Sequence, residues 1–224
     1  MSSNSGKTGK SVLVLAAHPD DETLGCGGTI AKLSDMGYNI QLLTFTDGVD
    51  ARGVRGEKNR NIRLGKIAEL LGIGEFAHAN FPDNRMDTTP LLDICKFIED
   101  SVPDQPDIIF THHPDCLNVD HSMVYRSTIT VFRPQFGNSV DLFAYYVPSA
   151  TDYNPLNKFI GNTYFDVSEF VQKKINALKV YDEEIRKYPH SRSYENILNM
   201  MKVYGSEVGV EYAEKFQSIR RVIV

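Results

Sequence analysis

The sequence predicts an α/β fold, with a Rossmann-like, mostly parallel sheet and helices on both of its faces. Short apolar segments typical of buried strands alternate with segments of helical period. The turns between these segments are short, which favours crossover connections between parallel strands. The 224 residues suffice for one substantial core and are few for two.

The first five expected strands are separated by expected helices. Residues 11–17, SVLVLAA, form an unbroken apolar run typical of a buried strand. Residues 57–73 carry apolar side chains at helical spacing up to the glycine at 72. In chain order, the expected elements are a strand at 11–17, a helix at 23–37, a strand at 38–46, a helix at 57–73, a strand at 76–81, a helix at 89–101, a strand at 107–113, a helix at 121–132 and a strand at 140–148.

The C-terminal third predicts elements that cover this sheet. Residues 168–189 have apolar side chains at helical spacing and predict one amphipathic helix lying on the rest. Residues 211–224 predict a last helical turn followed by a strand. The polar and basic residues 1–10 are expected to be a disordered tail, and residues 11–224 a single domain.

Composition excludes several classes of protein. The net charge of −5 argues against a general nucleic-acid binder. The longest apolar stretch, residues 12–17, is far shorter than the roughly 20 residues of a membrane span, and no apolar segment follows the N-terminus as in a signal peptide. Cys26, Cys95 and Cys116 are odd in number and widely spaced, so we expect no structural disulfide, no thiolate zinc site and a cytoplasmic protein.

The motif HPDDE, residues 18–22, follows the first expected strand. Ligands of open parallel sheets gather at the carboxyl ends of strands. His18 and Asp21, three residues apart around a loop-to-helix turn, are placed to face one centre, whereas Asp20 points elsewhere. An imidazole with a carboxylate suits a hydrolytic zinc site, which takes three protein ligands and a water.

A second polar cluster follows the expected strand at 107–113. It contains five residues that could supply the third ligand: His112, His113, Asp115, Asp120 and His121. The alternative for each cluster is structural, with acidic residues at 21–22 or Thr23 capping a helix and histidines satisfied in the interior or at the surface. Two such clusters at strand ends of one parallel sheet favour a metal site.

At this point the residues resemble a known family. The segment AAHPDDETLGCGG, with the later THH and LNVDH, is similar to the LmbE/PIG-L family of zinc-dependent N-deacetylases. The resemblance extends to TDG at 46–48, FPDNRMDT at 81–88, and to YPHSRSYENI and GVEYAEKF near the C-terminus. It is greatest with bacterial members that act on acetamido sugars, and it implies an LmbE-like fold.

The resemblance also implies roles for individual residues. His18 and Asp21 match the two early zinc ligands, and His121 matches the third. Asp20 matches the general base, and Asp120 matches the aspartate that orients or charges a catalytic histidine. A site of two histidines and one aspartate accepts zinc well and also takes ferrous iron, cobalt or manganese.

One position departs from the family pattern. Many members have H-P-D-H where this chain has Asn118-Val119-Asp120-His121. The histidine often assigned to the leaving amine or the oxyanion is therefore Asn118 here, and its role must pass to another residue or to solvent. The candidates are His112, His113 and His190. Cys26 and Cys116 lie near the clusters but match no family ligand, so they are expected to pack as small residues.

Substrate contacts are predicted from charge. Between positions 52 and 66 the chain has six cationic residues and one acidic residue, Glu57. Such a segment could bind the hydroxyls, a carboxylate or a diphosphate of the substrate. The alternative is a loop followed by the solvated face of a helix. Asp83 and Arg85 are placed either to line the cleft or to form a structural turn. The expected substrate-binding residues are Arg52, His113, Asn118, His190 and Arg192.

The function that the resemblance implies is metal-dependent removal of an N-acetyl group from an N-acetylated amino sugar, a nucleotide-sugar or glycan precursor, with release of acetate. The alternatives are hydrolysis of an amide in an amino-sugar thiol conjugate, and a non-catalytic sugar- or nucleotide-binding module. Because related folds often assemble, a homo-oligomer is also expected.

Overall fold

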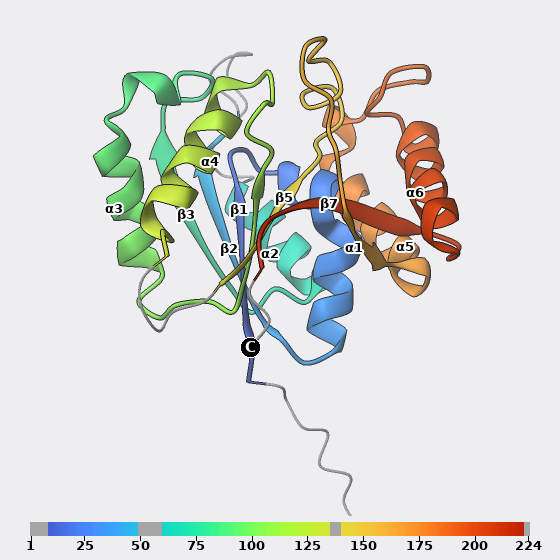
Figure 1. The fold of residues 1–224 in the computed structure, drawn as a ribbon, viewed down its shortest axis with the longest axis horizontal. Helices are drawn as coiled ribbons and strands as arrows, with labels where there is room; N and C mark the ends of the chain where they lie inside the picture. The colour runs from blue at the N-terminus through green and yellow to red at the C-terminus, as the bar shows by residue number, and fades with distance from the viewer. Residues whose placement is uncertain (1–8, 49–59, 135–139, 222–224) are drawn as a thin grey trace, which may run out of the picture.

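A seven-stranded sheet in the order β3-β2-β1-β4-β5-β7-β6 forms the centre of the molecule in the computed structural model (Figure 1). The structure describes residues 9–48, 60–134 and 140–221, so the expected tail lies almost entirely outside the described residues. The strands are β1 (Ser11–Ala16), β2 (Asn39–Thr46), β3 (Glu75–Phe81), β4 (Ile108–His112), β5 (Asp141–Tyr145), β6 (Thr163–Asp166) and β7 (Ala213–Arg220).

The sheet is mostly parallel, as the sequence predicts. Strands β1 to β5 pair in parallel, and β7 runs antiparallel to its neighbours β5 and β6. Val12 to Leu15 of β1 are 0–1% exposed, because helices cover both faces of this central strand. The carboxyl ends of β1 and β4 therefore meet at one edge of the sheet, where the two polar clusters follow them.

Two groups of helices cover the two faces of the sheet. The face that includes Val12 and Val14 packs against α1 (Asp21–Asp35), α2 (Arg60–Leu71), α5 (Val171–Leu178) and α6 (Tyr194–Val208). The opposite face, with Leu13 and Leu15, packs against α3 (Leu91–Ser101) and α4 (Val119–Val131). Among the described residues, no helix has the length and apolar character needed to cross a bilayer.

The C-terminal third differs from the sequence prediction. The helix expected at 168–189 is broken into a 3-10 turn at Ser168–Phe170, helix α5, and a second 3-10 segment at Lys179–Glu184. The backbone of Tyr181 is non-helical, and the residue is only 2% exposed. The helix is therefore interrupted where this side chain is buried. The strand expected within 211–224 is confirmed as β7, but no helical turn precedes it.

Helix α6 and strand β6 were not predicted. Two helix signals flank α6: the Ser193 hydroxyl accepts a hydrogen bond from the Asn196 amide at 3.1 Å, and Gly209 ends the helix with φ of 79°. Strand β6 has only four residues and pairs at the sheet edge with β7, which leaves little signal in its own sequence.

Helix α1 is interrupted at Cys26, whose φ of −143° and ψ of 21° are not helical. In a regular α-helix, the amides of Gly28 and Thr29 would donate to the carbonyls four residues earlier. Here they donate instead to the carboxylate of Glu214 in β7, at 3.0 and 2.7 Å. The last strand of the chain thus supplies the acceptors that the interrupted first helix lacks.

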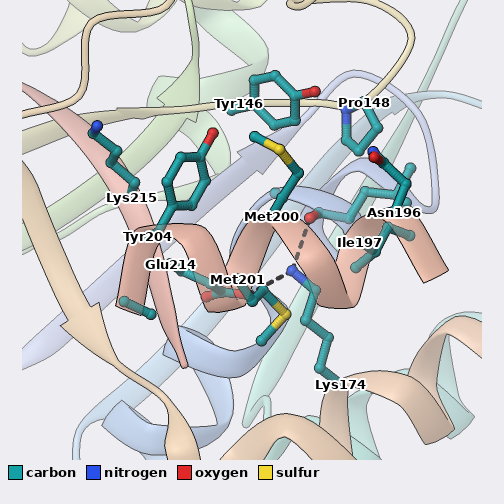
Figure 2. Close-up of a pocket in the computed structure, with 13 residues that line it drawn as sticks. Tyr146, Pro148, Lys174, Asn196, Ile197, Met200, Met201, Tyr204, Glu214 and Lys215 are labelled. Atoms are coloured by element: carbon teal, nitrogen blue, oxygen red, sulfur yellow. Dashed lines mark hydrogen bonds and ion pairs between the residues drawn. The ribbon is translucent and has the colours of Figure 1, made fainter. Parts of the chain in front are cut away.

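Lys174 of α5 also binds at the interruption of α1. Its ammonium donates to the Leu24 carbonyl at 2.9 Å. It also pairs with Glu214 at 2.6 Å, and Figure 2 shows these two side chains together. Both side chains are 3% exposed or less. The adjoining cavity of about 30 Å³ has room for one or two waters and not for a sugar, so this pair is structural. The interruption lets the first turn of α1 direct its acidic residues independently of the rest of the helix.

Replacing Gly25 with alanine is expected to destabilise the protein by about 1–3 kcal/mol, because the new Cβ would lie 2.3 Å from the ring of Tyr145. That ring cannot move easily, since its hydroxyl donates to the Leu15 carbonyl at 2.7 Å. Gly65→Ala in α2 is the control: its Cβ meets nothing within 4 Å, and we expect a gain of about 0.5–1 kcal/mol. Urea unfolding compares the two variants, and equal stabilities would contradict the packing described here.

Candidate active site

The candidate site lies at the edge of the sheet where β1 and β4 end, beside the segment that connects β3 to α3. After β1 the chain turns through residues 17–20 and enters α1 at Asp21. Asp20 occupies the position before the helix with φ of 137°, a conformation unusual for any residue except glycine, and its side chain makes no capping hydrogen bond. The helix begins at Asp21, so none of residues 21–23, which the capping alternative named, occupies the N-cap position.

The side chains of the partly buried His18 and the buried Asp21 and His121 converge on one point, as the sequence predicts. Asp21 Oδ2 lies 3.1 Å from His18 Nδ1 and 3.2 Å from His121 Nε2, and these two nitrogens are 3.3 Å apart. Tetrahedral ligands at about 2.0–2.1 Å from a zinc ion stand about 3.3 Å from one another. The second oxygen of Asp21, Oδ1, is buried without a hydrogen-bond partner among the described residues. The donors therefore fit a divalent cation.

The opposite nitrogen of His18 is held by two carboxylates. His18 Nε2 lies 3.1 Å from Asp120 Oδ2 and 3.2 Å from Asp83 Oδ1. Asp120 is itself fixed, because the backbone amides of Asn84 and Met86 donate to its two oxygens at 2.6 and 3.0 Å. Since a carboxylate only accepts, Nε2 carries the hydrogen and Nδ1 is left as the atom that faces Asp21.

The charges in this cluster are strongly coupled. Burial would lower the pKa of His18, but hydrogen bonds to its carboxylate neighbours raise that pKa well above its usual value. Burial opposes the protonated form of His121 too, yet Asp21 raises the pKa of His121 to about 9. The pKa of Asp21 is held well below its usual range because His121 outweighs burial. The cluster thus favours positive charge at its centre, supplied by protons or by a shared cation.

His112 supports the ligands from behind. Its ring stacks on that of His121 with centroids 3.8 Å apart, and its Nε2 accepts the Ala17 amide at 2.9 Å. Burial lowers the pKa of His112 well below its usual value, so this ring is neutral. The sequence left the role of His112 open, and in the structure it is a buried residue that packs against the ring of His121.

Asp20 is not one of the three donors, and its carboxylate pairs with Arg192. The guanidinium of Arg192 donates to Asp20 Oδ2 at 3.0 Å and to the hydroxyl of Ser149 at 2.8 Å. Burial raises the pKa of Asp20 to about 7, against the lowering effect of Arg192. Arg192, predicted to bind substrate, is thus placed on the candidate base.

Glu22 fixes the strained backbone of Asp20. Its side chain is fully buried, and it accepts the Asp20 amide at 3.1 Å and the Thr23 hydroxyl at 2.7 Å. The last residue of HPDDE therefore contributes to the turn that presents Asp20, a role that the spacing of the motif did not indicate.

The structure separates the other predicted residues. The side-chain oxygen Oδ1 of Asn118 caps α4 by accepting the Asp120 amide. Its side-chain nitrogen Nδ2 donates to Asn84 Oδ1 at 3.0 Å. His113 turns away from the cluster and packs edge-on against Phe159. His190 Nδ1 accepts the Arg192 amide at 3.1 Å, which leaves Nε2 without a partner among the described residues. Arg52 lies outside the described residues, so its role stays a prediction.

Sequence reasoning gave too little weight to Asp83 and Cys116. Asp83 was placed either in a cleft or in a turn, and Cys116 was expected only to pack. Asp83 contacts His18, and the Cys116 sulfur lies 3.0 Å from His121 Nδ1. The signal for both was present, since each follows the carboxyl end of a strand that borders the site.

Comparisons with known proteins show which sequences and folds are similar to this chain. Residues 13–132 match the family model described as PIG-L, GlcNAc-PI de-N-acetylase. The uncharacterized deacetylase YaiS of Escherichia coli K12 is 32% identical over 133 residues, which span 55% of this chain and 69% of YaiS.

Two solved structures share the fold. The N,N'-diacetylchitobiose deacetylase from Pyrococcus horikoshii has a TM-score of 0.70 and 25% identity, covering 96% of this chain and 85% of its own. The 4-carboxy-2-hydroxymuconate hydratase GalB from Pseudomonas putida KT2440 has a TM-score of 0.71 and 20% identity, covering 96% and 98%. Because one is a deacetylase and the other a hydratase, the reaction has to be argued from the site rather than from the fold.

Proposed function

The chain belongs to the PIG-L, GlcNAc-PI de-N-acetylase, family, and from this premise we propose that it is a metal-dependent hydrolase that removes the N-acetyl group of an N-acetylated amino sugar. The substrate class follows the family description and the diacetylchitobiose deacetylase, which both name N-acetylated sugars as substrates. His18, Asp21 and His121 would hold the ion, and Asp20 would serve as the base.

The arrangement of the three donor atoms carries this proposal. Their separations of 3.1, 3.2 and 3.3 Å match those of ligands around one tetrahedral ion. Three protein ligands leave a fourth position for water or substrate, which distinguishes a hydrolytic site from a structural one. Asp20, which is buried beside this cluster and is not one of the three donors, is free for proton transfer.

A divalent ion bound there supplies a polarised amide carbonyl and a water that ionises near neutral pH. Asp20 accepts the proton that the attacking water loses as its oxygen bonds to the carbonyl carbon. Asp20 then returns this proton to the amide nitrogen as the C–N bond breaks, which yields acetate and a free amine. Arg192 fixes the Asp20 carboxylate for both transfers through the contact at 3.0 Å.

We assign the role of the missing family histidine to His190. Asn118 is occupied by Asp120 and Asn84, and His112 is fully buried. His190 is half-buried, and its side-chain Nδ1 accepts the backbone amide of Arg192, which places it next to the residue that holds Asp20. Its unengaged Nε2 is suited to donate a hydrogen bond to the oxyanion, while Asp20 protonates the leaving nitrogen.

The proposal is tested by metal content and amine release. We expect near-stoichiometric zinc or another divalent ion in the purified wild type, and loss of most of it in His121→Ala, which removes one of three ligands. His78→Ala is the control, because His78 bonds to Thr44 in the sheet and not to the cluster. A fluorescent amine assay on N-acetyl sugars and nucleotide sugars measures turnover. A wild type that binds no supplied metal, or that releases amine from no N-acetyl sugar, would contradict the proposal.

A further inference from the structure

The second imidazole of the cluster is held by a different kind of group from the first. His18 is oriented by two carboxylates, whereas His121 Nδ1 faces the sulfur of Cys116 at 3.0 Å. Cys116 is 7% exposed, so this contact is protected from water. The two histidines that contact Asp21 are therefore oriented by different groups, His18 by carboxylates and His121 by a sulfur.

The tautomer of His121 determines what the sulfur does. If His121 Nε2 offers its lone pair to an ion beside Asp21, then Nδ1 carries the hydrogen and requires an acceptor. Among the described residues, the side-chain partner of Nδ1 is the Cys116 sulfur. Histidine ligands of metals almost always donate this second hydrogen to a carboxylate, a carbonyl or water, so a thiol in this place is unusual.

The sulfur is itself fixed from behind. Cys116 Sγ lies 3.4 Å from the hydroxyl of Thr151, and that hydroxyl accepts the Val147 amide at 2.9 Å. Thr151 is 2% exposed, and the Leu117 amide donates to the Ala150 carbonyl at 3.2 Å, which ties the two loops together. The loop after β5 thus positions Cys116, and Cys116 positions the ring of His121.

We propose that Cys116 is a positioning residue for the metal site, in which its sulfur accepts the Nδ1 hydrogen of His121 and fixes the ring and the tautomer. This inference rests on the proposed metal site and concerns binding of the ion rather than turnover. Cys116 is not a ligand itself, because the sulfur lies against Nδ1 and not against Nε2, the nitrogen that faces Asp21. Because a neutral sulfur is a weaker acceptor than a carboxylate, His121 is the less strongly supported ligand of the pair.

The test measures zinc affinity of the metal-free full chain by competition with a chromophoric chelator. Cys116→Ala is expected to weaken zinc binding about 10–100-fold, the usual effect of removing the group behind a metal-bound histidine. Cys116→Ser is expected to recover most of this loss, since a hydroxyl oxygen also accepts the Nδ1 hydrogen. Cys95→Ala removes a thiol of similar burial in α3, away from the cluster, and is expected to leave zinc affinity unchanged.

Two results would overturn the inference. Cys116→Ala that binds zinc as tightly as the wild type would make Cys116 a packing residue only, whatever the effect on the melting temperature of the metal-free chain. A sulfur-to-cobalt charge-transfer band in the cobalt-loaded wild type, lost in Cys116→Ser, would make Cys116 a ligand instead. Amine release is recorded separately, so a chain that shows the expected zinc affinities without deacetylating any sugar would refute the proposed function and leave this inference standing.

Discussion

Replacing Asp20 with asparagine is expected to lower turnover about 10²–10⁴-fold while metal content stays at the wild-type level. The substitution keeps the size of the side chain and leaves the three donor atoms in place, but an amide cannot take up the proton of the attacking water. The Arg192 guanidinium still finds an oxygen acceptor in the asparagine, so the loop that carries Arg192 keeps its anchor. Steady-state amine release and bound metal are measured on the same preparation.

The matched control is Asp115→Asn, which makes the same chemical change at an exposed residue that is not among the grouped donors. Its turnover is expected to equal that of the wild type. If Asp20→Asn retained turnover within a few-fold of the wild type, Asp20 would be excluded as the base. A sugar-binding module would behave differently again, because neither the wild type nor the variant would release amine and both would keep their affinity for the sugar.

Breaking the buried pair between Lys174 and Glu214 is expected to lower the free energy of unfolding by about 3–5 kcal/mol. Lys174→Met leaves the Glu214 carboxylate buried without its counter-charge. Glu214→Gln leaves the Lys174 ammonium buried without its counter-charge. The loss is large because water cannot reach either group to replace the lost partner. Chemical denaturation of the metal-free chain measures it without a contribution from bound ion.

An ion pair of equal length elsewhere provides the control. Lys215 and Glu207 also lie 2.6 Å apart, but their side chains are 16% and 36% exposed. Lys215→Met is therefore expected to cost no more than about 1 kcal/mol. Similar losses for Lys174→Met and Lys215→Met would mean that the buried pair does not sustain the interrupted helix α1.

The parts of the fold that the sequence predicts are those in which neighbouring residues carry the pattern. The apolar run at 11–17 and the alternation of strand and helix up to residue 148 yielded five strands and four helices in the correct order. The break at Tyr181 follows from tertiary burial, which local periodicity does not record. Helix α6 had a cap at each end, Ser193 and Gly209, and was missed because its residues were interpreted only as a motif.

The candidate site divides in the same way. The convergence of His18, Asp21 and His121 follows from the edge at which parallel strands end, so it was predictable from spacing and resemblance. His112 and His113 were not separable by composition, yet adjacent residues at the end of a strand point to opposite sides, and only His112 meets the cluster. The contact of Arg192 with Asp20 spans 172 residues and leaves no local sign.

The dependence of α1 on Glu214 also has a consequence for the order in which the molecule can form. The HPDDE turn is synthesised well before β7, because the acceptors for the amides of Gly28 and Thr29 arrive 186 and 185 residues later. Contacts this distant in the chain slow folding, because the entropy of closing so long a loop is lost before the contact is gained. The helix that presents Asp21 is thus made well before it can be completed, and a nascent chain that ends before β7 carries the whole motif without the acceptors that complete this helix.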